Sequence, residues 1–274
     1  LNTTDLRDFL DNDNLENRRK WREISQNDVF TMRYNRSLDD ARDQALEQLQ
    51  AVADANLVSV KDFRDNPRNI FAAHEMLGYI DGSLATKFTV QFNLYGGTLI
   101  SLGTERHQEY IERIDNLSGI GCFALTELGY GNNAIEMETT ATYDSKNKQF
   151  IINSPTTLSQ KYWITNGACH AKFALVFAQL LIDGKNEGVH VFLTRIRNED
   201  LSVCSGVFIE DMGLKQGCNG VDNARLGFSN VRVPQANLLN AYSDVDENGK
   251  FHSEIKGRRR RFLKVAQRLL SGRV

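Results

Sequence analysis

The 274-residue sequence lacks the features that mark several specialised classes of protein. No run of about 18 apolar residues is present, so no segment is expected to span a membrane. The formal net charge of -2 gives no general basic excess, which argues against a nucleic-acid partner. The four cysteines are far apart and form no CxxC pair, so we expect free or buried thiols instead of a disulfide framework.

Signals that would fix a compartment are also missing. The sequence starts at Leu1 without an initiator Met and stops at Val274 within an amphipathic run, so we expect both ends to be incomplete. No signal or transit peptide is visible. The last four residues, SGRV, do not form a peroxisomal tripeptide of the Ser-Lys-Leu kind. The residues alone therefore assign no compartment.

Several kinds of site find no support in the sequence. No pair of histidines has the spacing of metal ligands, so we predict no metal site. His170, at the head of an apolar run, is expected to be a structural histidine with satisfied hydrogen bonds. No G-x-S-x-G motif is present, which leaves a serine hydrolase without support. Alternating strand and helix patterns are absent as well, which argues against a doubly wound Rossmann sheet.

The first part of the chain has the periodicity of helices. Ser37 stands three residues before Asp40, which is the spacing of a capping box, and apolar residues then recur at helical intervals. The stretch 70–102 is long and apolar, and we interpret it as two buried helices in close contact. Residues 1–118 are therefore predicted to form an N-terminal helical domain.

Near residue 119 the pattern changes to short runs with period two, separated by polar turns. These runs predict that residues 119–240 form a small antiparallel β-barrel or sandwich, and thus an α+β fold overall. A polar linker at about 240–250 precedes another helical pattern at 261–270. We therefore predict that residues 241–274 are the linker and first helix of a second helical domain.

A glycine-rich segment at 129–134, GYGNNA, formally fits the dinucleotide fingerprint G-x-G-x-x-A. That fingerprint works only where a helix N-terminus follows to receive a pyrophosphate, whereas a Thr-rich strand pattern follows here. Two interpretations remain. The segment is either a plain turn between strands, or a turn whose backbone N–H groups approach a cofactor or substrate groove.

Several motifs, in order along residues 70–274, resemble those of acyl-CoA oxidases. Residues 122–133, CFALTELGYGNN, resemble the family's C-F-A-M-T-E-L-G-H-G-S-N, and residues 139–144, TTATYD, resemble T-T-A-T-F-D. Further matches are similar to the family's L-G-T-x-x-H, D-N-G and F-x-x-V-R-V-P, at 102–107, 221–223 and 228–234. Together these matches are far more specific than any single one, and they are strongest to the longer-chain branch of the family.

The resemblance implies an acyl-CoA dehydrogenase-like order of domains, with FAD bound between the β-barrel domain and the C-terminal helices. The threonine of the first motif holds the pyrimidine edge of the flavin in this family, which implies that role for Thr126. Phe123 and Leu125 would contribute main chain. The following turn lies near the cofactor, which implies contacts from Gly131 and Asn132. Asn132 departs from the usual Ser; it keeps hydrogen-bonding capacity but is bulkier.

Residues 161–167, KYWITNG, form the second site motif. By themselves they predict a strand with a buried aromatic side chain that ends in an Asn-Gly turn. They also resemble the K-x-W-I-T-N-G of acyl-CoA dehydrogenases, which implies that Trp163 packs on the flavin and that the Thr165 hydroxyl bonds near flavin N5. Oxidases more often have Gly in place of Thr165, so the electron acceptor stays open.

The function implied by the resemblance is that of an FAD-dependent acyl-CoA oxidase in fatty acid β-oxidation. Such an enzyme converts fatty acyl-CoA to trans-2-enoyl-CoA with release of hydrogen peroxide, in the peroxisome, as a homodimer or as a subunit of a larger assembly. The family's base is a Glu in the C-terminal helices, which no residue here matches, so the catalytic residues are unknown. Glu127 is expected to be structural. Two alternatives remain: an inactive homologue with a structural or interaction role, and an acyl-CoA dehydrogenase with a protein acceptor.

The segment 256–261, KGRRRR, is the only strong block of one charge. It fits a solvated helix start. It also fits an anion site, because arginine forks suit the phosphates of CoA or of a flavin diphosphate from a neighbouring subunit. The sequence does not single out one arginine for that role.

Overall fold

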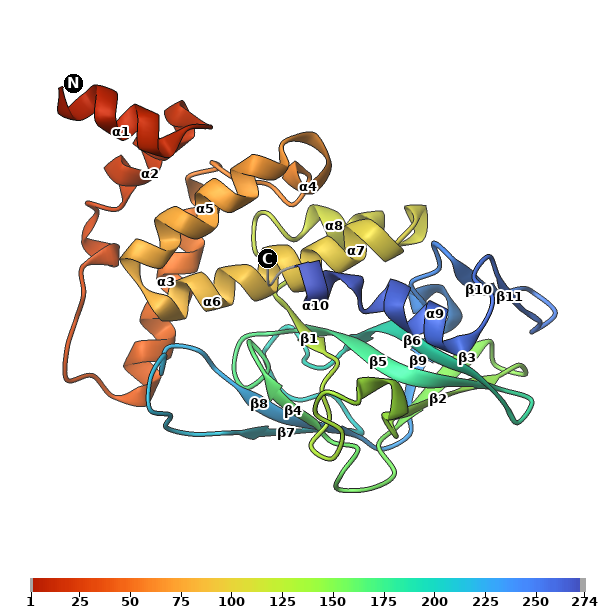
Figure 1. The fold of residues 1–274 in the computed structure, drawn as a ribbon. Coiled ribbons are helices and arrows are strands. Elements are labelled where there is room, and N and C mark those ends of the chain that lie inside the picture. The colour runs from red at the N-terminus through yellow and green to blue at the C-terminus, as the bar shows by residue number, and fades with distance from the viewer. Residues whose placement is uncertain (1, 272–274) are drawn as a thin grey trace.

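The computed structural model describes residues 2–271 and confirms the α+β class (Figure 1). The N-terminal helices lie on one side of a curled β region. The last two helices, α9 (Arg258–Val265) and α10 (Gln267–Ser271), return across that side, where α9 packs on strand β6 (Lys185–Arg195). None of the described helices combines the length and apolar character that a membrane span requires.

The helical part follows the start signals in the sequence. Ser37 caps its helix as predicted, because the backbone N–H of Asp40 donates to the Ser37 hydroxyl at 3.1 Å. Pro67 occupies the first turn of the next long helix, where its missing N–H costs nothing. The helices in chain order are α1 (Thr3–Asp11), α2 (Leu15–Ile24), α3 (Leu38–Asp54), α4 (Asp62–Asp65), α5 (Pro67–Ile80), α6 (Gly82–Phe88), α7 (Gly97–Leu102) and α8 (Gln108–Glu112).

The prediction of two buried helices within 70–102 is confirmed. The break falls at Asp81, whose carboxylate accepts from the backbone N–H groups of Ser83 and Leu84 at 2.8 and 2.9 Å and so starts a new helix. That second helix consists of α6, a π-helical segment (Thr89–Gly96) and α7. It lies against the β region and supplies one wall of the pocket described below.

The strands form two sheets and a hairpin. The larger sheet has the order β1-β5-β2-β3-β9, with β6 paired to β5; the smaller has the order β4-β8-β7; and β10 pairs with β11. Their bounds are β1 (Gly121–Ala124), β2 (Thr140–Asp144), β3 (Gln149–Asn153), β4 (Lys161–Ile164), β5 (Phe173–Ile182), β7 (Val207–Asp211), β8 (Ala224–Phe228), β9 (Val231–Pro234), β10 (Ser243–Val245) and β11 (Phe251–Ser253).

Two details differ from the sequence-based expectation. The larger sheet is not wholly antiparallel, because β5 pairs parallel with both β1 and β2. The long excursion through β2, β3 and β4 provides the crossover that lets β5 run in the same direction as β1. The expected linker at about 240–250 is also not free of structure: β10 lies within it and forms a hairpin with β11 around Gly249, whose φ is +78°.

Strand β5 separates two hydrophobic cores. Phe173, Leu175 and Phe177 face the helices, while Ala174 and Val176 face the interior of the curled sheet. All are almost fully buried, and each large side chain contributes about 2 kcal/mol by leaving water. The β region is thereby fixed against the helical layer, and this fixed interface positions the candidate site.

Candidate functional site

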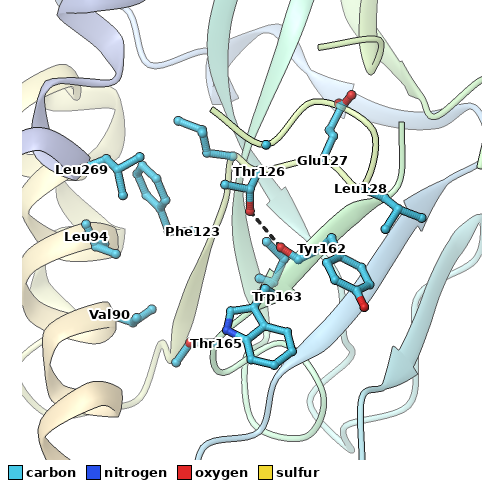
Figure 2. A pocket seen from close by; sticks show the side chains of 13 residues that line it. Val90, Leu94, Phe123, Thr126, Glu127, Leu128, Tyr162, Trp163, Thr165 and Leu269 are labelled. Atoms are coloured by element: carbon cyan, nitrogen blue, oxygen red, sulfur yellow. Dashed lines mark hydrogen bonds between the residues drawn. The ribbon is translucent and has the colours of Figure 1, made fainter. Parts of the chain in front are cut away.

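A pocket of about 390 Å³ opens between the α6–α7 helix and the β1 and β4 strands (Figure 2). Its wall is mostly apolar, and its volume lies within the range of small-molecule sites. Six of the seven residues predicted from sequence to contact a cofactor line it: Phe123, Leu125, Thr126, Gly131, Trp163 and Thr165. The structure thus brings together two motifs that lie some 35 residues apart in the chain.

Asn132 is the predicted residue that does not line this pocket; it is exposed beside Gly131. Gly131 has a φ of +42°, and a Cβ added there would meet no atom within 4 Å. The Gly-rich segment is a turn followed by a short 3-10 helix and then by β2, and not by an α-helix. It is therefore not a dinucleotide fingerprint, and one side of the turn faces the pocket.

Trp163 adopts a backbone conformation that bulky residues rarely take. Its φ is +66°, and the register of β4 against β8 shifts between Lys161 and Ile164, as at a β-bulge. A left-handed φ is costly for a bulky residue, by roughly 1–3 kcal/mol. The bulge turns the indole outward, so that Trp163 is 56% exposed. The prediction of a strand here is confirmed by β4, and a turn follows it, but the prediction that its aromatic side chain is buried is wrong.

Thr126 is tied to the neighbouring segment by two hydrogen bonds (Figure 2). Its hydroxyl donates to the carbonyl of Tyr162 at 2.8 Å, and the N–H of Tyr162 donates to the carbonyl of Thr126 at 2.9 Å. Because the hydroxyl proton is used in this way, the oxygen of Thr126 has lone pairs left only for accepting a hydrogen bond.

Thr165 offers a hydrogen-bond donor, whereas Thr126 offers an acceptor. Its hydroxyl oxygen accepts from the side-chain amide of Asn223 at 3.2 Å, so its own proton remains available to donate. Thr165 is half-buried and Asn223 is buried. The pocket thus offers one acceptor and one donor along an otherwise apolar wall with an exposed indole.

Glu127 holds a loop beside the pocket. Its buried carboxylate accepts from Lys161 Nζ at 2.9 Å and from the backbone N–H groups of Glu138 and Thr139 at 2.8 and 3.0 Å. In Figure 2 its side chain points away from the middle of the pocket. Burial lowers the pKa of Lys161, and the charge of Glu127 opposes that shift. These contacts support the expected structural role of Glu127.

His170 is buried among polar partners, as expected for a structural histidine. Its Nδ1 lies 3.0 Å from Lys87 Nζ, and its backbone N–H donates to Asp222 at 3.2 Å. Since the ammonium of Lys87 can only donate, Nδ1 accepts and the ring proton is on Nε2. No cluster of three potential metal ligands occurs among residues 2–271.

The arginine block is not uniform. Arg261 is buried and donates to the carbonyl of Glu187 at 2.7 and 3.0 Å and to its carboxylate at 3.2 Å. It therefore fastens α9 to β6. Arg258, Arg259 and Arg260 are exposed, which fits both a solvated helix start and an anion site, whereas Arg261 is already committed to Glu187.

Comparison with known proteins identifies the relationship. Residues 122–231 match the family described as "Acyl-CoA dehydrogenase, middle domain". The peroxisomal acyl-coenzyme A oxidase 3 of Arabidopsis thaliana is 46% identical over 201 residues, covering 73% of this chain and 30% of that protein. Human peroxisomal acyl-coenzyme A oxidase 3 is 38% identical over 240 residues, covering 87% and 34%.

The chain belongs to the acyl-CoA dehydrogenase and oxidase superfamily. The crystal structure of acyl-CoA oxidase 1 from Yarrowia lipolytica superposes with a TM-score of 0.83 at 31% identity, over 94% of this chain and 37% of that one. Acyl-CoA oxidase 2 of Caenorhabditis elegans, solved with FAD, ascaroside-CoA and ATP, gives a TM-score of 0.78 at 26% identity, over 93% and 38%. The chain therefore spans about a third of the length of these relatives.

Other residues of this superfamily pocket were not singled out from sequence. Val90 and Leu94 come from the π-helical segment, Tyr162 from β4, and Leu269 from α10. Their apolar types and the four-residue spacing of the first two indicate only burial. Asn223 lay within a recognised motif, but nothing in the sequence pointed to its bond with Thr165.

Proposed function

We propose that this chain forms the flavin-binding half-site of an FAD-dependent acyl-CoA oxidase. The observation that supports it is the convergence of two motifs on one apolar pocket with a donor, an acceptor and an exposed indole. The named relatives, which are acyl-CoA oxidases and include one solved with FAD, favour the same cofactor. The proposal also keeps the domain division at residues 1–118, 119–240 and 241–274.

The residues in the pocket fit a flavin ring. An isoalloxazine has flat apolar faces, a hydrogen-bond acceptor at N5 and a donor at N3. We assign the indole of Trp163 to one ring face, where stacking is favourable. The donating hydroxyl of Thr165 suits N5, and the accepting oxygen of Thr126 suits a donor on the pyrimidine side. Backbone groups at Phe123 and Leu125, and the open turn at Gly131, complete the assignment, with Asn132 at its edge.

FAD, when bound, supplies the acceptor for the hydride that leaves the β-carbon of a fatty acyl-CoA. The protein's share is to bind and orient the ring and to exclude water from it. Val90, Leu94 and Leu269 cover the pocket from the helical side. We assign no catalytic base to the described part of the chain; the α-proton goes to a carboxylate yet to be located.

The overall reaction that we propose turns a fatty acyl-CoA and oxygen into trans-2-enoyl-CoA and hydrogen peroxide. Atoms balance, because the two hydrogens removed from the substrate appear in the peroxide. The Arabidopsis and human relatives are named as peroxisomal, and we propose the same compartment and a role in fatty acid β-oxidation for this protein. A homodimer or larger assembly is proposed on the same basis.

The test uses the protein purified from cells that express its gene. We expect the visible absorption bands of bound flavin, and peroxide release on addition of a long-chain acyl-CoA. Thr126→Val and Trp163→Ala should weaken flavin retention, whereas Thr142→Val, on the exposed face of β2, should not. A protein without flavin, or unchanged retention in both pocket variants, would refute the assignment.

A separate measurement distinguishes oxygen from other electron acceptors. Thr165 stands where oxidases more often have Gly. If the substrate bleaches the flavin but oxygen gives no peroxide, while an artificial electron acceptor is reduced, the protein is a dehydrogenase. Peroxide formed in step with enoyl-CoA supports the oxidase.

A further inference from the structure

One buried hydrogen bond determines the polarity of the pocket on the side of Thr165. The side-chain amide of Asn223 donates to the Thr165 hydroxyl oxygen at 3.2 Å. Asn223 is 3% exposed, and both residues line a second pocket of about 610 Å³. This second pocket shares Tyr162, Trp163 and Thr165 with the first. One side of Thr165 therefore faces the pockets, where solvent or a ligand can contact it. The other side contacts Asn223.

A threonine hydroxyl has one proton and two lone pairs, so the partner on its protein side decides what it offers to a ligand. When that partner is the N–H of Asn223, the hydroxyl accepts there and keeps its proton for the pocket. If the partner were an acceptor, the proton would turn toward it and only lone pairs would face the pocket. Asn223 thus selects a donor at Thr165.

The buried ammonium group of Lys87 holds the segments of Thr165 and Asn223 together, and we call this lysine with its acceptors the clamp. Lys87 Nζ, on α6, is fully buried and donates to Asp222 at 2.5 Å and to Asn166 at 2.9 Å. Asp222 directly precedes Asn223, and Asn166 directly follows Thr165. One ammonium group therefore fixes the two chain segments against each other at the point where their side chains meet.

The backbone around Asn223 is fixed on both sides as well. Its carbonyl accepts from the N–H of Met212 at 3.1 Å, and its own N–H donates to Val221 at 3.1 Å. The other oxygen of the Asp222 carboxylate accepts from the N–H of Cys169 at 2.8 Å. With the main chain held at these points, the side chain of Asn223 starts from a fixed position beside the hydroxyl of Thr165.

We propose that Asn223 is a positioning residue that makes Thr165 a hydrogen-bond donor to flavin N5. This inference rests on the proposed function, because it requires the flavin to occupy the pocket. It adds a role for a buried residue that acts through the orientation of the hydroxyl proton of Thr165.

The test compares the binding of FAD and 5-deaza-FAD by the apoprotein, prepared by stripping the flavin from the purified protein. The analogue carries C–H in place of N5 and cannot accept a hydrogen bond. Dissociation constants follow from flavin fluorescence during titration. A donor at Thr165 should make FAD bind about fivefold more tightly than the analogue, the value of one ordinary hydrogen bond. Thr165→Val should bring this ratio to about one.

Asn223→Asp is the decisive variant, because it keeps the shape of the side chain and replaces the donor with an acceptor. The hydroxyl of Thr165 should then turn toward residue 223, and the preference for FAD should fall to about one or reverse. Asn223→Ala frees the hydroxyl to rotate, so the ratio should be intermediate, at about twofold. The added charge of the first variant affects both ligands alike and cancels in the ratio.

The outcomes separate the inference from the proposed function. If the wild type binds neither flavin, the flavin assignment fails and the inference fails with it. If it binds both equally, flavin is bound but no donor faces N5, and only the inference is overturned. If the wild type prefers FAD and Thr165→Val does not, but Asn223→Asp and Asn223→Ala keep the wild-type ratio, only the inference is overturned. A change of ratio by Asn223→Asp in the Thr165→Val background would also overturn it, because Asn223 would then act by another route.

Discussion

Replacing Lys87 by Met should destabilise the protein strongly, and the structure gives the size of the effect. Lys87 is 0% exposed and donates to Asp222, Asn166 and His170 at 2.5, 2.9 and 3.0 Å. Burial alone would raise the pKa of Asp222, but the charge of Lys87 and its hydrogen bond to the carboxylate act against burial, and the pKa is lowered overall. Asp222 is therefore ionised at neutral pH. Without Lys87 it would be a buried carboxylate that has lost its bound ammonium group, at a cost of about 3–5 kcal/mol.

Urea unfolding at neutral pH measures this cost. Met fills nearly the same volume as Lys, so cavity formation adds little. With a slope of about 2 kcal/mol per molar, the midpoint should fall by about 2 M urea. Lys61→Met, at an exposed position, is the matched control and should shift the midpoint very little. Adding Asp222→Asn to the Lys87 variant removes the orphaned charge and should recover much of the loss. A loss below about 1 kcal/mol for Lys87→Met would contradict this expectation, since it would mean that water reaches the carboxylate.

Other perturbations give equally definite expectations. Burial lowers the pKa of His190 to about 4. Below about pH 6.5 the unfolded chain therefore binds a proton at this histidine that the folded protein does not bind, so stability is lost as the pH falls toward 4. The loss should reach about 3 kcal/mol, and His190→Gln should flatten that part of the pH profile of the urea midpoint. Glu127→Gln leaves Lys161 buried without a carboxylate and should cost about 3 kcal/mol in the same assay, whereas the exposed Glu136→Gln should cost almost nothing. Trp163→Gly removes a side chain from a left-handed backbone position, so stability should stay level or rise by up to about 1 kcal/mol while FAD binding weakens; a clear loss of stability would contradict the assigned strain.

The fold class was predictable because its signals are local. The Ser37 cap and the apolar recurrence after it depend on residues within one or two turns of helix. The period-two runs depend on the alternation of side chains across a strand. The resemblance of two motifs to one family likewise assigned Thr126 and Trp163 to one site, and the pocket contains both.

The features that were missed depend on which distant segments meet. The parallel pairing of β5 with β1 follows from a crossover of nearly fifty residues, whose path no local pattern records. The outward indole of Trp163 depends on a positive φ and a register shift against β8. A strand pattern read from sequence assumes ordinary φ and so buries the wrong side chain at this position.

Lys87 is the clearest example of a residue whose role could not be predicted from the sequence. In sequence it is an ordinary lysine within a helical pattern, a type of residue that is rarely fully buried. Only the packed structure shows that it joins the residues next to Thr165 and Asn223. An apolar side chain there could give equal or greater stability, but hydrophobic contacts have no direction. An ammonium group with three acceptors constrains both distance and angle. The clamp therefore fixes the distance and angle between the segments that carry Thr165 and Asn223, which apolar contacts alone would leave less defined.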